Sequence, residues 1–336
     1  MSMGIKMQVK ICCGLQHGDE AKGKVSAILQ QKQKFDYVCR ASGGPNAGHT
    51  IYNNDKKHVL HHIPSGVLYN TPCIIGAGCV VNTVTFFEEL KELKEFNAEK
   101  LVKVAYNTHV ITNKHVIEDC QVNGNGVKVG STGRGIMPSY RDKYARIGTR
   151  AESVLDPHYI CDPYELFKNA NHILIEGAQG FNLCPDHGDY PFVTSSSPTA
   201  AYALHSLGIA PSTNSILVYG AAKVYETYVG SKSFQPDDEI FSTLQKLGSE
   251  YGATTGRPRQ CNWLNLDTLQ RAVDINGAQI VIMSKCDVLE KLDTFKLYHH
   301  GKVVNFSTLE LFKTFIRDNI SAAVYFSGTK DGWDDC

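Results

Sequence analysis

The chain has 336 residues, of which 42% are hydrophobic and 20% are charged. These proportions are typical of a globular protein and exclude wholesale disorder. Lys and Arg together number 34, as do Asp and Glu, so the chain lacks the basic excess that binding to nucleic acid or an anionic membrane usually requires. No apolar run is long enough to span a membrane, and the first ten residues contain no apolar signal core. We therefore expect a cytoplasmic protein that binds neither nucleic acid nor membranes.

Short β-branched runs alternate with stretches of helical character along the chain. Predicted strands cover residues 8–13, 37–40, 73–75, 172–175, 215–219, 279–283 and 322–326. Predicted helices cover residues 20–31, 83–94, 163–169, 237–247, 265–275 and 308–319. This alternation predicts an α/β fold with a mostly parallel central sheet flanked by helices, similar to the P-loop NTPases. The polar segments 120–150 and 180–200 are predicted to be long functional loops, and we expect a single domain over residues 1–336.

The first predicted strand leads into a glycine-rich segment, Gly14 to Lys24, and then into a helix. Glycine lets backbone N–H groups approach a phosphate, the start of a helix adds the positive end of a dipole, and lysines supply charge. The segment lacks the spacing of a standard P-loop. It is compatible with a phosphate site and also with an ordinary strand-to-helix connection.

Two later segments favour a nucleotide site. Residues 40–50 form a second glycine-rich stretch after a predicted strand, and Ser284-Lys285-Cys286-Asp287 follows another strand. These four residues are similar to the guanine-reading element of GTP-binding proteins. In that element an aspartate accepts two hydrogen bonds from guanine, while the lysine stem packs on the base.

Seven segments in order carry a resemblance to a known family. They are residues 14–24, 43–50, 61–68, 131–136 with Asp142, Lys143 and Arg146, 176–180, 190–196 and 253–259. Together they resemble the adenylosuccinate synthetases, and the resemblance runs from about residue 8 to about residue 290. It implies a ligase that uses GTP and Mg²⁺ to join L-aspartate to C6 of a 6-oxopurine nucleotide.

The resemblance also implies the order of chemical steps. The purine O6 is a very poor leaving group, so it must first be phosphorylated. A general base takes the N1 proton, O6 attacks the γ-phosphate of GTP, and the amine of L-aspartate then displaces phosphate from C6. By resemblance, the catalytic residues are Asp19 as the base, His49 as the group that stabilises the transferring phosphoryl group, and Gln179. Mg²⁺ is expected on Asp19 and on the carbonyl of Gly48.

The remaining site residues carry over from the family position by position. GTP is expected to be bound by Gly18, Glu20, Lys22, Gly23, Lys24, Gly48, Thr50, Arg259, Lys285 and Asp287. The purine nucleotide is expected to be bound by Asn46, Thr132, Arg146, Gln179, Thr194 and Arg257. L-Aspartate is expected to be bound by Thr254, Thr255, Gly256, Arg257 and Arg259. In the family the residue matching Arg146 enters the partner's site, which implies a homodimer.

Some positions depart from the family's pattern. His17 stands where the family usually has tryptophan, and Ala21 stands where it usually has glycine. Because a Cβ atom disfavours left-handed backbone, we expect Ala21 to avoid that conformation. Residues 326–330 resemble the family's C-terminal guanine contact only loosely.

The length of the chain bears on the acceptor nucleotide. Typical cellular members are longer, whereas short forms occur in heat-loving archaea and in bacteriophages that build 2-aminoadenine into DNA. The chain has 11 Cys, 19 Asn and 12 Gln, which argues against heat adaptation. We therefore expect dGMP as the acceptor, giving N6-succino-2-amino-2′-deoxyadenylate, and the host cytoplasm as the location if the chain is phage-encoded.

Two alternatives stay open. IMP is the other acceptor, because Asp19 and residues 284–287 are retained here, whereas members of the phage branch often lack them. A GTP-binding regulatory module without ligase activity is a remote second alternative. It would leave residues 131–146 and 253–259 without a purpose.

Overall fold

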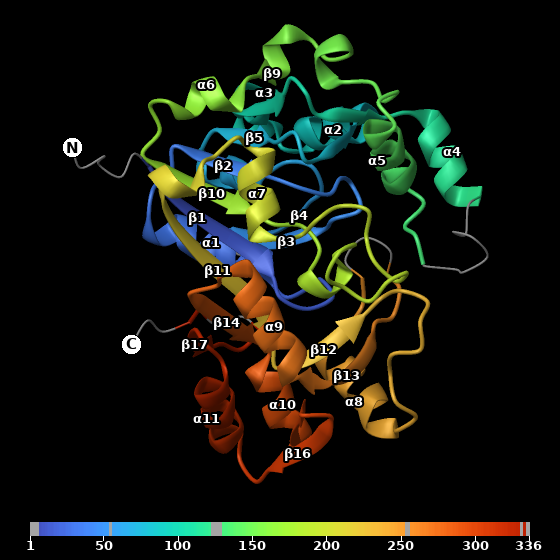
Figure 1. Cartoon of the computed structure of the whole chain (residues 1–336), viewed down its shortest axis with the longest axis vertical. Helices are drawn as coiled ribbons and strands as arrows, with labels where there is room; N and C mark the ends of the chain where they lie inside the picture. The colour runs from blue at the N-terminus through green and yellow to red at the C-terminus, as the bar shows by residue number, and fades with distance from the viewer. Residues whose placement is uncertain (1–6, 54–55, 122–129, 253–255, 330–331, 334–336) are drawn as a thin grey trace.

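The structure is a computed structural model that describes residues 7–53, 56–121, 130–252, 256–329 and 332–333. Within these residues the largest element is a nine-stranded sheet in the order β17-β14-β11-β1-β10-β2-β5-β7-β9 (Figure 1). Each pair of neighbouring strands in it is parallel. Its strands are β1 (Gln8–Gly14), β2 (Tyr37–Arg40), β5 (Cys73–Ile75), β7 (Val102–Ala105), β9 (Ile160–Cys161), β10 (His172–Glu176), β11 (Ser215–Lys223), β14 (Ile280–Ser284) and β17 (Ala323–Phe326). All seven predicted strands belong to this sheet, and the predicted fold class is confirmed.

Smaller sheets lie beside the large one. A four-stranded sheet contains β12 (Tyr225–Tyr228), β13 (Gln260–Asn265), β15 (Phe295–His299) and β16 (Lys302–Phe306). An antiparallel pair is formed by β3 (His49–Asn53) and β4 (Lys56–Leu60), and a parallel pair by β6 (Val80–Asn82) and β8 (His109–Ile111).

The helices include the six that the sequence predicts, with ends shifted by at most two residues. These are α1 (Lys22–Lys32), α2 (Thr83–Glu92), α6 (Pro163–Phe167), α8 (Glu239–Gly248), α9 (Leu266–Asn276) and α11 (Leu309–Asn319). The structure adds α3 (Ala98–Leu101), α4 (Asn113–Gln121), α5 (Ile136–Tyr144), α7 (Ala200–Ser206) and α10 (Cys286–Leu292). The prediction that 120–150 is entirely loop is therefore wrong. Ile136 and Tyr140, one turn apart on α5, pack in a small buried cluster with Val80 and Ile111.

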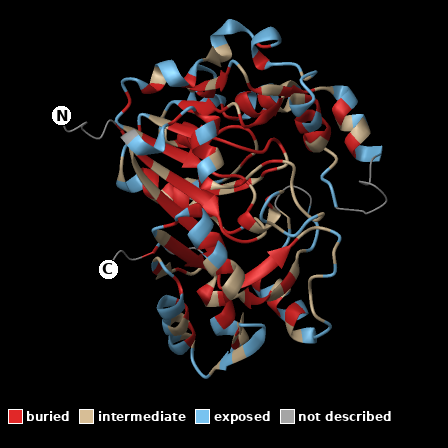
Figure 2. Cartoon of the chain, viewed as in Figure 1, coloured by how far each residue is buried: buried red, intermediate tan, exposed pale blue. Residues whose placement is uncertain are grey.

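The core fills both faces of the large sheet, as expected for a parallel sheet covered by helices. Val9 and Ile11 on β1 point into one cluster, and Cys12, the residue after Ile11, points into the other. Helices α7 and α9 contribute to the first cluster and helices α1 and α2 to the second. Figure 2 shows this buried band through the centre of the molecule. Both faces of the sheet are thus covered, so ligands are expected at the carboxyl ends of the strands.

Candidate active site

Six neighbouring strands end at one edge of the large sheet, because they run parallel. In sheet order from β17 to β2, the segments at this edge are 327–329, 285–287, Lys223 with its successors, 14–21, 177–180 and 41–48. Eight of the predicted site residues lie in these segments, namely Gly18, Asp19, Glu20, Asn46, Gly48, Gln179, Lys285 and Asp287. Open α/β sheets bind ligands at this edge, so we take it as the candidate active site.

A buried glutamate fixes the backbone of the first loop, which spans residues 14–21 after β1. Glu20 is 1% exposed, and its Oε1 accepts hydrogen bonds from the N–H groups of Gln16 at 3.1 Å and Gly18 at 2.7 Å. Its Oε2 accepts one from Lys22 Nζ at 2.6 Å. The Glu20 carboxylate and the Lys22 ammonium therefore face each other inside the loop.

The backbone of this loop is left-handed at several residues. The φ angle is 94° at Gly18, 60° at Asp19 and 64° at Ala21. The expectation that Ala21 avoids this conformation is wrong. Ala21 is the residue immediately before α1, and the hydrogen bonds to Glu20 fix the turn that precedes it. This conformation turns Asp19 outward, with a side chain that is 36% exposed.

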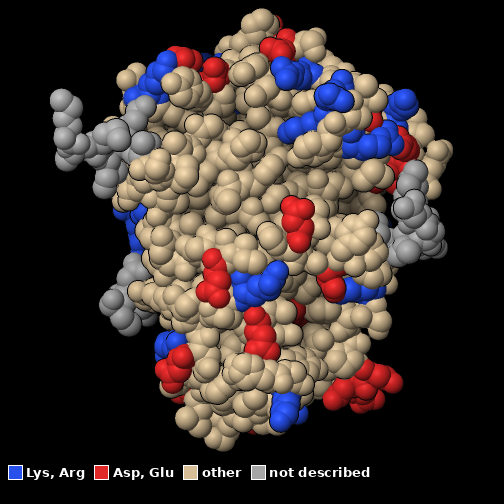
Figure 3. Space-filling model, in the orientation of Figure 1, with Lys and Arg blue, Asp and Glu red and all other residues tan. Residues whose placement is uncertain are grey.

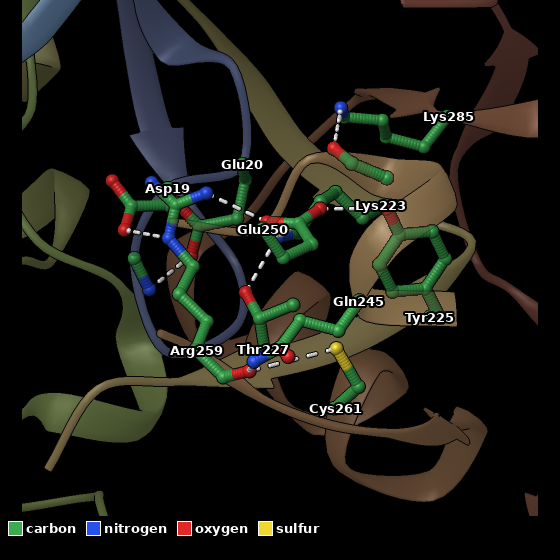
Figure 4. Close-up of polar contacts among 12 residues, drawn as sticks. Asp19, Glu20, Lys223, Tyr225, Thr227, Gln245, Glu250, Arg259, Cys261 and Lys285 are labelled. Carbon is green, nitrogen blue, oxygen red and sulfur yellow. Dashed lines mark hydrogen bonds and ion pairs between the residues drawn. The ribbon is translucent and has the colours of Figure 1, made fainter. Parts of the chain in front are cut away.

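Asp19 forms an ion pair with Arg259, the outermost residue of a buried ion-pair network (Figure 4). Its Oδ2 lies 2.8 Å from Nε of Arg259. The same guanidinium donates from Nη1 to Glu250 Oε2 at 2.6 Å. One arginine thus links the exposed Asp19 carboxylate to a carboxylate in the interior.

Glu250 is the centre of that network and is fully buried. It accepts hydrogen bonds from the hydroxyl of Tyr225 at 2.6 Å and from Lys223 Nζ at 3.3 Å. Burial raises the pKa of Glu250, but Lys223, Arg259 and Lys285 outweigh burial and hold this pKa at about 2. Sequence reasoning missed Glu250 and Lys223 as site residues, because the two are 27 residues apart and neither stands in a recognisable motif.

His49 is buried on the other side of the first loop. Its Nδ1 lies 2.8 Å from Nη1 of Arg40, and arginine has only donors, so Nδ1 must be the acceptor. The proton of the neutral ring is then on Nε2. Burial lowers the pKa of His49 well below its usual value, and the cations Arg40 and Lys22 act in the same direction. His49 is therefore a neutral residue with one N–H to offer a ligand.

Arg40 itself is 2% exposed and was also missed by sequence reasoning. It ends β2 opposite Glu176, which ends β10. Burial raises the pKa of Glu176, whereas Arg40 and the hydrogen bonds from Ser65 lower it. Arg40 thus contributes to the charge balance of this edge as well as to the tautomer of His49.

A second cluster lies around Asp287, in the first turn of α10. Asp287 Oδ1 accepts a hydrogen bond from the hydroxyl of Thr329 at 3.0 Å. Lys24 Nζ donates to the Gly328 carbonyl at 2.8 Å. Lys285 donates from Nζ to the Gly248 carbonyl at 2.9 Å, and burial lowers its pKa. The loosely matching segment after β17 therefore lies beside Asp287, where a guanine contact is expected.

The surface around these clusters carries both signs of charge. On the face shown in Figure 3, most of the basic side chains gather at the upper right, around α5, with acidic side chains beside them, and the other charges are scattered. Among the described residues, no helix is both long and apolar enough to cross a membrane.

The comparison with protein families agrees with this geometry. The model of a family described as adenylosuccinate synthetase matches residues 11–167 and 159–334. The chain belongs to the adenylosuccinate synthetase family. Adenylosuccinate synthetases are GTP-dependent ligases that form a C–N bond, and the chain is an enzyme of this type.

Curated relatives and solved structures support the same assignment. An adenylosuccinate synthetase of Chlorobium limicola is 36% identical over 345 residues, covering 85% of this chain and 78% of the relative. One of Christiangramia forsetii is 38% identical over 347 residues, with 87% and 81% covered. The fully ligated adenylosuccinate synthetase of Plasmodium falciparum superposes with a TM-score of 0.84 at 26% identity, covering 95% of this chain and 97% of that one.

A phage enzyme shares the fold as well. The succinoaminodeoxyadenylate synthetase of cyanophage S-2L, solved with dGMP and with dATP as energy donor, has a TM-score of 0.72 at 20% identity. The match covers 93% of this chain and 99% of that one. At this identity the similarity concerns the fold alone.

Four of the six residues expected for the purine nucleotide come from four separate segments. Asn46 accepts a hydrogen bond from the N–H of Gly44 at 3.1 Å, and Gln179 is left-handed, with φ at 62°. Thr194 follows a short turn, with its N–H donating to the Leu183 carbonyl at 2.8 Å. Thr132 is exposed, three residues after the end of the undescribed segment 122–129.

The loop expected to bind L-aspartate is described only in part. Thr254 and Thr255 lie outside the described residues. Gly256 is left-handed, with φ at 63°, and Arg257 next to it is exposed. The backbone carbonyl of Arg257 accepts a hydrogen bond from the N–H of Gly252 at 2.8 Å, which closes the base of the loop.

Three further residues expected near GTP lie where α1 packs on β3. A Cβ atom on Gly23 would lie 2.8 Å from the Thr50 carbonyl oxygen, so Gly23 allows the helix and the strand to approach closely. Gly48 immediately precedes β3, and Thr50 is its second residue. The packing of Gly23 on Thr50 fixes how β3 presents His49 to the first loop.

Proposed function

We propose that this enzyme condenses L-aspartate with C6 of IMP, using GTP as the phosphate donor. The observation that carries the catalytic part is the placement of Asp19. Its partly exposed carboxylate stands on the first loop, paired with Arg259, at the sheet edge to which β2 and β3 bring His49. The acceptor is supported by the relatives named adenylosuccinate synthetase, which are 36–38% identical.

In the proposed reaction Asp19 takes the N1 proton of the purine, and O6 forms a bond to the γ-phosphorus as the bond to the β,γ-bridging oxygen breaks. Nε2–H of His49 donates to the transferring phosphoryl group, which gains stabilisation from a donor fixed in advance. The amine of L-aspartate then attacks C6, and inorganic phosphate leaves. Arg257 and Arg259 are proposed to hold the carboxylates of L-aspartate, since a planar guanidinium pairs well with a carboxylate.

The residues expected for Mg²⁺ suit that ion. Mg²⁺ prefers oxygen ligands and is commonly held by one or two carboxylates together with phosphate oxygens. Asp19 offers a partly exposed carboxylate and Gly48 a backbone carbonyl, both from segments at the active-site edge. When bound there, Mg²⁺ would neutralise charge on the phosphates of GTP.

The neutral form of His49 leads to a first prediction. His49→Ala should lower kcat by about 10²- to 10³-fold, because one fixed donor to the phosphoryl group is lost. His49→Gln should lose less, because its amide places an N–H near the position of Nε2. The measurement is kcat for both variants at saturating substrates. Equal losses in the two variants would contradict a donor role for Nε2.

The second prediction concerns the donor base. Asp287→Ala should weaken GTP binding by about 10- to 100-fold, because a charged acceptor for guanine is worth about 1.5–3 kcal/mol. ATP binding should change little. Thr329→Val is the control, because it removes the hydrogen bond to Asp287 and leaves the carboxylate in place. If Asp287→Ala keeps the wild-type ratio of GTP to ATP affinity, guanine is read elsewhere.

The acceptor proposal differs from the expectation drawn from chain length. dGMP carries an amino group at purine C2 that needs room in the site, and the first-loop departures at His17 and Ala21 are the positions to examine for that room. The His17 ring instead is 6% exposed, packs edge-on against Tyr228 and Phe234, and lies 3.3 Å from Glu226. Histidine in place of the family's usual tryptophan at position 17 is therefore accommodated by packing against neighbouring aromatic rings. The phage enzyme solved with dGMP keeps dGMP as the second candidate through its shared fold.

One assay separates the two acceptors. We would measure kcat/KM for IMP and dGMP side by side, at saturating GTP and L-aspartate, with product identified by mass. We expect efficient use of IMP and weak use of dGMP. A kcat/KM for dGMP above that for IMP would overturn the proposal and restore the expectation from chain length. GTP hydrolysis that needs neither purine nor L-aspartate would instead favour the regulatory module.

A homodimer with shared sites is also proposed. Arg146 is exposed just after α5, with its backbone left-handed at φ of 65°. Tyr144 and Ile147 beside it are 66% and 72% exposed, which is high for apolar side chains. A second copy of the chain would cover them and receive Arg146 in its purine site.

A further inference from the structure

The turn between β15 and β16 brings two imidazoles to one carboxylate, away from the active-site edge. His299 is the last residue of β15, His300 follows it, and Asp267 lies in the first turn of α9. Nδ1 of His299 is 3.0 Å from Asp267 Oδ1, and Nδ1 of His300 is 3.6 Å from the same oxygen. Ligand atoms of the three residues all lie within 4.8 Å of one another.

The backbone of the turn explains why neighbouring histidines point the same way. Successive side chains on a strand normally face opposite sides. Here φ is 50° at His300 and 70° at Gly301, the two positive values of a type I′ hairpin, in which Asn, Asp or Gly is the usual first residue. The two imidazole centroids are consequently 3.9 Å apart.

The carboxylate and one ring are also held in place. The backbone N–H of His300 donates to Asp267 Oδ2 at 2.7 Å, which leaves Oδ1 for the two rings. The His299 ring packs edge-on against Phe315 of α11, with centroids 5.4 Å apart. Two elements outside the hairpin, α9 and α11, therefore fix the arrangement.

We propose that His299, His300 and Asp267 bind a divalent transition-metal ion such as Zn²⁺, with water completing the coordination. In a tetrahedral zinc site, bonds of about 2.1 Å place neighbouring ligand atoms about 3.4 Å apart. The two nitrogen-to-oxygen distances of 3.0 and 3.6 Å lie on either side of this value. Imidazole ligands favour zinc, copper or nickel over the magnesium that the active site is expected to use.

The site is accessible without any movement of the fold. The side chain of His300 is 81% exposed, that of Asp267 is 39% exposed and that of His299 is 19% exposed. A bound ion would connect the hairpin to the first turn of α9. Binding to the folded chain alone would raise its thermal stability in proportion to occupancy.

The test is a calorimetric titration of the nucleotide-free chain with Zn²⁺, with thermal unfolding followed in parallel. We expect about one high-affinity Zn²⁺ per chain. Affinity should be at least about 10- to 100-fold lower in His300→Ala and in Asp267→Asn, because losing even a group that only orients a metal ligand costs this much. His158→Ala is the control, because it removes another exposed histidine that lies beside an aspartate, Asp156.

Both site variants should fold, which keeps the test decisive. His300 is largely exposed, and asparagine at 267 retains an acceptor for the His300 N–H. Circular dichroism and the melting temperature without metal would confirm this. Zn²⁺ affinity that is unchanged in both variants, or a wild-type chain that binds no Zn²⁺, would overturn the proposal.

Discussion

Asp19→Asn should lower turnover by about 10²- to 10⁴-fold, the usual range for the loss of a general base. The amide retains the shape of the carboxylate but cannot accept the N1 proton. Asparagine also tolerates the left-handed backbone that Asp19 adopts, so the loop should keep its conformation. The measurement is kcat with all three substrates saturating, together with the melting temperature.

Asp293→Asn is a matched control for this variant. Asp293 is also left-handed, with φ of 52°, but it ends α10 and is exposed. It should keep wild-type turnover. Near-normal kcat in Asp19→Asn would remove Asp19 from the role of base, whereas a large fall in melting temperature would assign it a structural role.

Glu250→Ala should lower the free energy of unfolding by about 3–5 kcal/mol, the range for removing one partner of a buried ion pair. The variant leaves Lys223, which is 1% exposed, without its carboxylate and frees one side of Arg259. Urea unfolding at neutral pH would measure the change. Glu239→Ala on the exposed side of α8 is the control and should change stability by less than about 0.5 kcal/mol.

The same residue gives a pH dependence with a definite sign. The pKa of Glu250 is about 2 in the folded chain, against an ordinary value of 4.5. A depressed pKa stabilises the fold fully above 4.5, and this stabilisation is lost as the pH falls from 4.5 towards 2. The stability difference between wild type and Glu250→Ala should therefore shrink in this acid range. A difference that stays constant would show that the charge of Glu250 contributes nothing.

The sequence predicted the parallel sheet well because each strand carries its own signal. A run such as residues 172–175 is mostly apolar and β-branched, and this local pattern is sufficient to predict a buried strand. The motifs at residues 14–24 and 284–287 were also correctly placed at strand ends, so their meeting at one edge follows from parallel pairing alone.

The buried charges could not be predicted in this way. Charged residues such as Arg40, Lys223 and Glu250 usually lie on the surface. Only the tertiary fold shows which opposite charge each of them contacts in the interior. Helix α5 was not predicted for a related reason: its apolar residues pack against Val80 and Ile111, which come from distant strands. At Ala21 a local rule failed, since contacts made by its neighbour Glu20 outweigh a preference of roughly 1 kcal/mol.

The contacts of Lys24 with Gly328 and of Asp287 with Thr329 join the start of α1 to the segment after β17. During synthesis, the chain up to Thr329 must leave the ribosome before these groups can meet. The proposed guanine pocket is therefore assembled late in biogenesis, and GTP can stabilise only molecules in which β17 has already docked against β14. Nucleotide supply would then act on the yield of correctly finished enzyme as well as on the rate of the reaction.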